Sequence, residues 1–261
     1  MSDNPENTER TTEKLLSIIS ALHERGPQGV TELATYLDIP KSTVHYHLQA
    51  LKDQGYVVQT DQKYRIGLRF LEIGGQARRR IPLFEAAADE INDLADGTGD
   101  LAILMVEEQG LGTILYKQAG DEAIDMDASI GRRARLHDRA LGKAILAHLP
   151  EERVEAIIQE YGLRQTTEHT IDDREELFDS LEQIREEGVS YNRGEAVEGL
   201  RGVAVPILTD EGEVLGAISI AGPAARLDGD RFTEELPNRL FQAKNVIELK
   251  IQKNASSHMN H

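Results

Sequence analysis

Apolar residues in the first part of the chain recur with the spacing of helices. Within residues 10–23 they fall on one helical face, at Leu15, Leu16, Ile18, Ile19 and Leu22. The stretch RGPQG at 25–29 should end this helix, and Thr31 is expected to be the N-cap of a short second helix. A third helix is expected from about Lys41 to Gln54, with its inward positions at Val44, Leu48 and Leu51.

The pattern changes after Gly55, where two short strand-like runs flank a polar turn. The runs are YVVQ at 56–59 and KYRIG at 63–67, and the turn between them is TDQ. Each of these elements is a weak indication by itself. Their order, with two helices, a brief turn, a third helix and a hairpin, predicts a winged helix-turn-helix.

The rest of the chain mixes helical and strand patterns. Residues 68–80 predict a linker helix that begins apolar and ends basic, and Gly74 and Gly75 would allow it to bend. A helix should run from Pro82 until Gly97 stops it, and Thr170 should cap a later helix with Asp173 as its capping-box-like partner. Further helices are expected at 137–150, 151–162, 170–188 and 233–253, and strands at 101–108, 111–118, 188–194, 202–208 and 213–223.

This second pattern predicts an α+β fold with a largely antiparallel sheet. The expected organisation is therefore a winged helix-turn-helix domain at 9–70, followed by the linker helix and a second domain at 71–254.

The third expected helix leaves hydrogen-bonding side chains on its outer face. Such a face can read base edges in a major groove, while Ser, Thr and Lys side chains and free backbone N–H groups hold phosphates. The candidate DNA-contacting residues of this helix are Lys41, Ser42, Thr43, His45, Tyr46 and Gln49. Lys63 and Arg65 of the hairpin should reach an adjacent groove or the DNA backbone.

Two other interpretations of this helix remain open. Its outer face could be solvated without any partner, or His45 and His47 could bind a metal ion. The spacing of the two histidines places them on different helix faces, and no nearby Asp or Glu completes a metal site. His47 is therefore expected to pack near a helix interface or to contact a phosphate.

Charge is divided unevenly along the chain, whose net charge is -17. Residues 1–80 carry 11 Lys and Arg against 10 Asp and Glu, whereas the remainder carries 18 against 36. A DNA-binding first domain is thus compatible with an acidic chain. The acidity, with 9 lysines against 20 arginines, favours a halophile's cytoplasm, where salt of about 1 M screens charges beyond about 3 Å, over an ordinary acidic protein.

Other features of the composition exclude several classes of protein. No apolar run approaches the roughly 20 residues of a membrane span, and MSDNPENTER lacks the basic start and apolar centre of a signal peptide. The chain has no cysteine, which excludes disulfides and cysteine-ligated zinc. The expected protein is cytoplasmic, with neither a membrane partner nor a cofactor.

Three motifs in order make the chain resemble the IclR family of transcriptional regulators. The first is GVTELATYLDIPKSTVHYHLQALKDQGYV at 29–57, followed by YRIGLRFLEIG. The others are LHDRALGKAILAHLP at 136–150, and IREEGVSYNRGEAVEGLRGVAVPI at 184–207 with GAISIAGP. The resemblance covers about residues 10–253. Tyr46 stands where the family usually has arginine, which leaves the base preference open.

The resemblance implies a GAF-like second domain with a curved antiparallel sheet and a pocket for an effector. Regulators of this family are usually homodimers or dimers of dimers that bind a double-stranded DNA operator, control catabolic genes and respond to small organic metabolites: sugar-derived, keto or aromatic acids. The motifs place effector-binding residues at Ala140, Leu141, Asn192, Leu200, Gly202 and Ser219. Asn192 replaces a frequent acid and Gly202 a frequent cysteine, so the resemblance does not identify the ligand.

Each of these apolar strand residues could equally belong to a packed sheet core. The arginines of RRARLH at 132–137 could attract an anionic ligand or be solvated loop charges. A catalytic second domain is the rival class, but the sequence has no phosphate-binding loop, HExxH or GxSxG motif. Asp125 with Asp127, and His137 with Asp138, are the remaining candidate pairs, without a recognisable partner. A sensory domain that reaches DNA only through a partner complex is a third interpretation.

Overall fold

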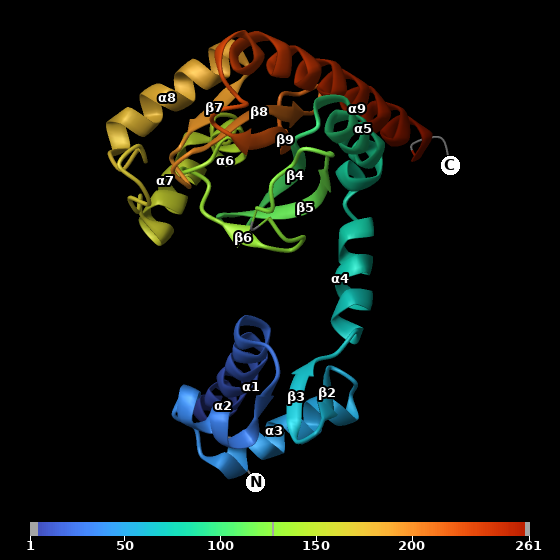
Figure 1. Cartoon of the computed structure of the whole chain (residues 1–261), viewed down its shortest axis with the longest axis vertical. Helices are drawn as coiled ribbons and strands as arrows, with labels where there is room; N and C mark the ends of the chain where they lie inside the picture. Colours follow the sequence, from blue (N-terminus) through green and yellow to red (C-terminus); the bar gives the residue numbers. More distant parts are fainter. Residues whose placement is uncertain (1–4, 127, 259–261) are drawn as a thin grey trace. The chain divides into compact units, whose positions relative to one another are not determined.

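The computed structural model describes residues 5–126 and 128–258, and it divides the chain into two compact units, Met1–Ala77 and Arg78–His261 (Figure 1). The division falls within helix α4, Arg69–Arg79. The domain boundary expected after residue 70 lies at the beginning of this helix and stays a prediction. Asp127 lies outside the described residues. No helix of the described part of the chain combines the length and the apolar character needed to cross a membrane.

The N-terminal unit is the predicted winged helix-turn-helix. Its core is formed by apolar residues of all three helices, including Ile18, Leu33 and Leu48, each fully buried. The helices and strands are α1 Pro5–Arg25, β1 Gln28–Gly29, α2 Val30–Leu37, α3 Lys41–Asp53, β2 Val57–Thr60 and β3 Lys63–Ile66. The antiparallel sheet has the order β1-β3-β2, so the short strand β1, which the sequence did not predict, extends the hairpin.

The predicted N-cap of α2 was wrong. The helix begins at Val30, and Thr31 lies inside its first turn. The carboxylate of Glu32 accepts a hydrogen bond of 2.7 Å from the backbone N–H of Gly29, which makes Gly29 the cap. The linker helix α4 continues through Gly74 and Gly75, and none of its side chains is buried.

The C-terminal unit has a six-stranded antiparallel sheet with helices on both faces, as the α+β prediction required (Figure 1). The strand order is β6-β5-β4-β9-β8-β7. The strands are β4 Leu101–Glu108, β5 Leu111–Ala119, β6 Arg133–Ala134, β7 Ser190–Arg193, β8 Leu200–Leu208 and β9 Val214–Pro223. The helices are α5 Pro82–Thr98, α6 Ala140–Leu146, α7 Glu151–Tyr161, α8 Arg174–Glu187, the π-helix η1 Arg231–Glu235 and α9 Leu236–His258.

Alternation along the strands separates two apolar layers. On β4, Leu104 faces the layer that contains α5 and α9, whereas Ile103 and Met105 face the layer that contains α6, α7 and α8. Successive strand residues point to opposite faces of a sheet, so a strand that is covered on both faces reads as one apolar run. This explains why LAILMV and VAVPIL lack an alternating polar pattern.

Several predicted boundaries in this unit were wrong. Helix α5 runs through Gly97 and ends at Gly99, whose φ of 76° provides the left-handed C-cap. Thr170 does not cap α8, because its hydroxyl is buried and bonded elsewhere; Asp173 is the cap and accepts from the Glu176 N–H at 3.0 Å. Helix α6 is shorter than the expected 137–150, the last helix begins with the π-turn of η1, and β6 was not predicted.

Candidate functional site

Helix α3 has one face in the core and one face in solvent. Val44, His47, Leu48 and Leu51 are buried. Lys41, Ser42, His45 and Tyr46 are exposed, and 69% of the Tyr46 surface is accessible. Pro40 precedes the helix and no side chain caps it, so the N–H groups of Lys41 and Ser42 point out of its N-terminal end, while the Thr43 N–H donates to the Pro40 carbonyl at 2.9 Å. The structure thus gathers the predicted residues of the first turns on one polar face.

Two predicted residues of this helix are less accessible. Thr43 and Gln49 are half-buried, and the Gln49 amide donates a hydrogen bond of 2.7 Å to the Asp53 carboxylate. While it holds Asp53, Gln49 keeps its second N–H and its side-chain oxygen for contact with a base. His47 is 3% exposed and packs its ring edge-on against Tyr46, with ring centroids 5.5 Å apart.

The two histidines of α3 do not form a metal site. His45 is exposed while His47 is buried, and burial lowers the pKa of His47, with a smaller contribution from the charge of Lys14. No group of three or more His, Asp or Glu side chains within the described residues is placed to hold a metal ion. His47 therefore serves the helix interface, one of the two roles expected for it.

The hairpin presents its two predicted cations on the same side of β3. Lys63 and Arg65 are exposed, and Tyr64 between them is buried in the core. The Lys63 ammonium lies 3.8 Å from a carboxylate oxygen of Glu32, and the Arg65 guanidinium donates to the carbonyl of Ile66. An exposed ion pair of this length is weak, so Lys63 stays available to a phosphate.

The C-terminal unit contains a cavity of about 450 Å³. The sheet contributes one wall from β4, β5, β7, β8 and β9, and the beginning of α6 and four loops contribute the others. All of the effector-binding residues implied by the resemblance line this cavity: Ala140, Leu141, Asn192, Leu200, Gly202 and Ser219. The structure brings them together from four separate segments; their contact with a ligand stays a prediction.

Charged groups lie beside apolar ones in the cavity wall. Asp125, Asp138, Arg132, Arg139 and Arg201 line it together with Ile103, Met105 and Leu141. Arg139 donates to the Asp138 carboxylate at 2.8 Å, and Arg201 pairs with Asp228 at 2.5 Å. Of the three arginines in the stretch RRARLH, only Arg132 lines this cavity within the described residues.

Asn192 and Ser219 have different roles in this wall. The Asn192 side-chain oxygen accepts from the N–H groups of Gly194 and Glu195, both at 2.9 Å, and its amide donates to the Asp138 carbonyl at 3.1 Å. Asn192 is thus bonded mainly to the protein and shapes the wall. Ser219 as a residue is 3% exposed, and no described residue hydrogen-bonds to its hydroxyl.

Gly202 widens the cavity. A Cβ built there would meet the Ile220 carbonyl oxygen at 3.6 Å and the Ala140 Cβ at 3.9 Å, which are ordinary van der Waals distances. A side chain at this position would therefore fit the backbone and fill part of the cavity.

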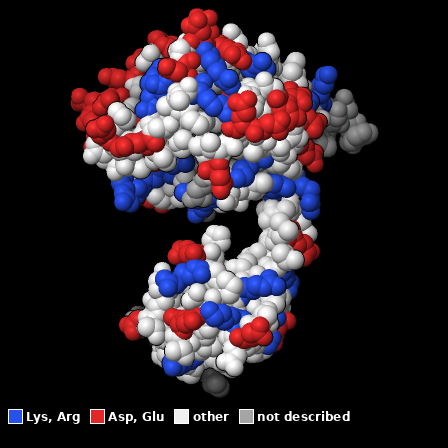
Figure 2. Space-filling view, viewed as in Figure 1, with Lys and Arg blue, Asp and Glu red and all other residues white. Residues whose placement is uncertain are grey.

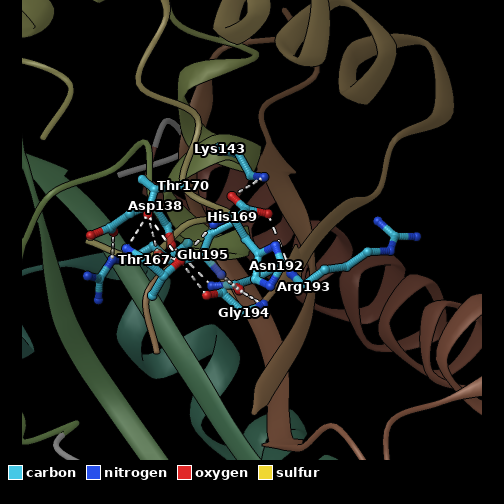
Figure 3. Close-up of polar contacts among 10 residues, drawn as sticks. Asp138, Lys143, Thr167, His169, Thr170, Asn192, Arg193, Gly194 and Glu195 are labelled. Carbon is cyan, nitrogen blue, oxygen red and sulfur yellow. Dashed lines mark hydrogen bonds and ion pairs between the residues drawn. The ribbon is translucent and has the colours of Figure 1, made fainter. Parts of the chain in front are cut away.

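A buried ion pair beside the cavity was missed by the sequence analysis. The ammonium of Lys143 lies 2.5 Å from the carboxylate of Glu195, and both residues are buried (Figure 3). Burial lowers the pKa of Lys143, while the charge of Glu195 opposes this shift. The sequence does offer one signal, because GEAVEG at 194–199 places the Glu195 carboxylate in a turn between two glycines. Its partner Lys143 lies 52 residues away in the chain, so no local pattern links the two.

The groups of the candidate pair His137 and Asp138 are bonded to other parts of the protein. The His137 ring is held by the Arg164 carbonyl at 3.1 Å, burial lowers its pKa, and the Asp138 carboxylate pairs with Arg139. Lys143 does not line the cavity, so its amine cannot attack a ligand there. Asp125 lines the cavity, but its expected partner Asp127 lies outside the described residues.

Comparisons with known proteins agree with both units. The family model described as "IclR helix-turn-helix domain" matches residues 11–61, and "Bacterial transcriptional regulator IclR C-terminal" matches residues 75–248. The chain is 32% identical to a probable HTH-type transcriptional regulator ArcR of Halobacterium salinarum, over 91% of this chain and 92% of that protein.

Solved structures show the same fold. The IclR structure of Thermotoga maritima has a TM-score of 0.77 and 26% identity, and the match covers 95% of this chain and 99% of that one. An IclR homologue of Microbacterium hydrocarbonoxydans, complexed with 4-hydroxybenzoate, has a TM-score of 0.77 at 23% identity, covering 92% and 99%.

Proposed function

Because the chain belongs to the IclR family of transcriptional regulators, we propose that it binds a pseudo-palindromic operator through α3 and the hairpin, and that a small metabolite in the C-terminal cavity modulates this binding. The genes controlled are catabolic, and the regulator acts in the cytoplasm. The observation that carries the proposal is the pairing, in one chain, of a polar recognition-helix face with a preformed cavity. A purely enzymatic role is not supported, because regulators of this family are not enzymes.

The exposed face of α3 supports direct DNA reading. Lys41 and Ser42 lie at the helix N-terminus, where phosphates bind, and His45 and Tyr46 lie one turn further along. None of the side chains proposed to read bases on α3 is arginine, so the common arginine contact to guanine is absent from this helix. Tyr46 instead offers a ring for a thymine methyl group and a hydroxyl for a base edge or phosphate.

The cavity supports a small organic acid as the effector. Its volume of about 450 Å³ is within the usual range for ligand pockets. Arg132, Arg139 and Arg201 provide cationic groups for a carboxylate, and the Ser219 hydroxyl can bond a polar substituent. The ligand classes proposed are sugar-derived acids, keto acids and aromatic acids.

A second copy of the chain is the proposed partner for helix α4. Leu71 and Ile73 are 73% and 45% exposed, and Leu68 just before the helix is 77% exposed. A pseudo-palindromic operator needs two α3 helices related by two-fold symmetry, which a homodimer or a dimer of dimers supplies.

Two experiments test this function on the purified chain. DNase footprinting and gel shifts upstream of the neighbouring operons should reveal a protected site with two half-sites, and its absence at all salt concentrations would contradict DNA binding. A thermal-shift screen of sugar acids, keto acids and aromatic acids, 4-hydroxybenzoate included, should find a compound that stabilises the chain and changes operator affinity. Stabilisation without any change in operator affinity would contradict the regulatory role.

A further inference from the structure

A buried ion pair in the C-terminal unit has no place among the ligand-contacting residues. Lys143 on α6 and Glu195 after β7 approach to 2.5 Å, and their side chains are 5% and 9% exposed. Neither residue lines the cavity. Transferring two charges from water into a protein interior is unfavourable unless geometry and further hydrogen bonds compensate.

The remaining polar groups of Glu195 are also bonded (Figure 3). Its N–H donates to the Asn192 side-chain oxygen at 2.9 Å, and its carbonyl accepts from the hydroxyls of Thr170 at 2.7 Å and Thr167 at 3.2 Å. Glu195 therefore ties three segments together: the end of β7, the loop before α8 and helix α6. It is the fixed point of the turn that connects β7 to β8.

The residues that follow Glu195 form part of the cavity wall. Ala196 and Val197 line the cavity, and Val197 is 53% exposed although it is apolar. Gly194 and Gly199 bracket this turn with φ angles of 91° and 77°, which are accessible mainly to glycine. The turn thus has permissive backbone at each end, a firm anchor at Glu195 and an apolar tip over the cavity.

We propose that residues 194–199 form a lid over the cavity, and that Glu195, locked by Lys143, is the positioning residue that sets how often the lid opens. Neither residue touches a ligand. A molecule in the cavity would cover the side chain of Val197 from one side, so apolar contact would favour the closed lid. The existence of the lid is independent of the effector, and its role in retaining the effector rests on the proposed function.

The absence of cysteine from the chain allows lid opening to be measured without knowing the effector. Ser219 is 3% exposed in the cavity wall, and cysteine is nearly isosteric with serine. In Ser219→Cys, the rate of reaction with 5,5′-dithiobis(2-nitrobenzoate) reports how often the reagent reaches this wall. The full chain is used, at a temperature well below unfolding.

Loss of the ion pair should open the lid. In the Ser219→Cys background, Glu195→Gln keeps the size of the side chain and removes its charge, and Lys143→Met removes the other charge. Each should raise the thiol reaction rate by about tenfold or more, because an uncompensated buried charge weakens the anchor. Glu195→Gln is the milder change, and it tests the lid by itself if Lys143→Met fails to fold.

A control tests whether the loss of a more exposed ion pair elsewhere in this unit also speeds the reaction. Lys250 of α9 pairs with Glu90 of α5 at 3.0 Å, in the helix layer on the other face of the sheet. Lys250→Met in the same background should leave the thiol reaction rate unchanged.

Three results would overturn the lid. They are equal rates in Glu195→Gln and its parent, the same increase in Lys250→Met, and reaction of Ser219→Cys at the rate of a free thiol. Hydrogen exchange of the unmodified chain gives a further check, because the amides of residues 196–198 should exchange faster than those of β8. The thiol reagent is the only small molecule required, so this experiment does not depend on the effector. The lid proposal and the effector proposal can therefore be contradicted separately.

Discussion

The two candidate sites differ in what their polar groups do before a partner binds. On α3, Lys41, His45 and Tyr46 project into solvent. In the cavity, Asn192 and Arg139 are already bonded to the protein. The first site is a surface that gains its hydrogen bonds when DNA arrives. The second is a preformed cavity whose wall, apart from the lid at residues 194–199, is fixed by internal bonds, so it selects mainly by shape and by the few groups left open.

The units also differ in charge. The part of the chain up to residue 80 is close to neutral, whereas the C-terminal part carries 36 of the 46 acidic residues. Figure 2 shows Asp and Glu side chains gathered over α8, where Glu175, Glu176, Glu182 and Glu186 are exposed. The total charge of a chain therefore says little about DNA binding when the charge is segregated by unit.

The largest expected effect is the loss of the effector response without a change in operator affinity. Gly202→Leu should fill the cavity and abolish the effector response, because its Cβ fits the backbone while the side chain occupies ligand space. Operator affinity without effector should stay unchanged. Isothermal titration with the effector from the screen and gel shifts with the operator measure the two properties, and retained effector binding would contradict the assignment of the cavity.

Replacing Tyr46 tests the other site. Tyr46→Ala should reduce discrimination between the operator and single-base variants by about 1–3 kcal/mol, or about fivefold to about 150-fold, if its ring and hydroxyl read a base. Gel shifts with a set of mutated operators measure this change. Glu24→Ala, an exposed position of α1, is the control, and an unaltered preference in Tyr46→Ala would remove this residue from base reading.

Lys41→Ala should have a smaller and more uniform effect. The loss of one phosphate contact should weaken all sites about equally and reduce the slope of log affinity against log salt by about 0.9. Affinities measured between about 0.1 M and about 1 M salt give the slope. We also propose adaptation to a salty cytoplasm, for which specific binding should persist at molar salt; a steep loss of specific affinity would contradict it.

The smallest expected effect is on the pH dependence of stability. Burial lowers the pKa of His47 below 6.5, so the unfolded chain binds this proton more readily than the folded chain. The stability gained is complete above about pH 6.5 and is lost as the pH falls through the lowered pKa. Between about pH 8 and about pH 5, the unfolding midpoint of the wild type should fall more than that of His47→Gln. Equal changes of the unfolding midpoint with pH in the wild type and in His47→Gln would contradict this role of His47.

The sequence predicted the polar face of α3 more fully than the cavity because that face is local. The polar face of α3 lies within a few helical turns, and Val44, Leu48 and Leu51 already define the opposite face. What the sequence did not predict there was the hydrogen bond between Gln49 and Asp53, since both side chains could equally have faced solvent.

The cavity could be located only through the family resemblance. Its wall combines Ala140 of α6 with Gly202 of β8 and Ser219 of β9. The pairing of β8 with β9 brings the two strand residues together, and no local pattern specifies that pairing. The Thr170 error has the same origin. A threonine before an acidic helix predicts a cap, but tertiary contacts direct its hydroxyl to the Glu195 carbonyl instead.

The central claim is that the cavity and α3 are coupled in one regulator. The most direct measurement is operator affinity of the full chain with and without the stabilising acid from the thermal-shift screen, in the wild type and in Gly202→Leu. Coupling predicts a change in operator affinity of about fivefold or more in the wild type and none in the variant. Equal operator affinities in the wild type with and without a bound acid, or the same change in both proteins, would contradict it.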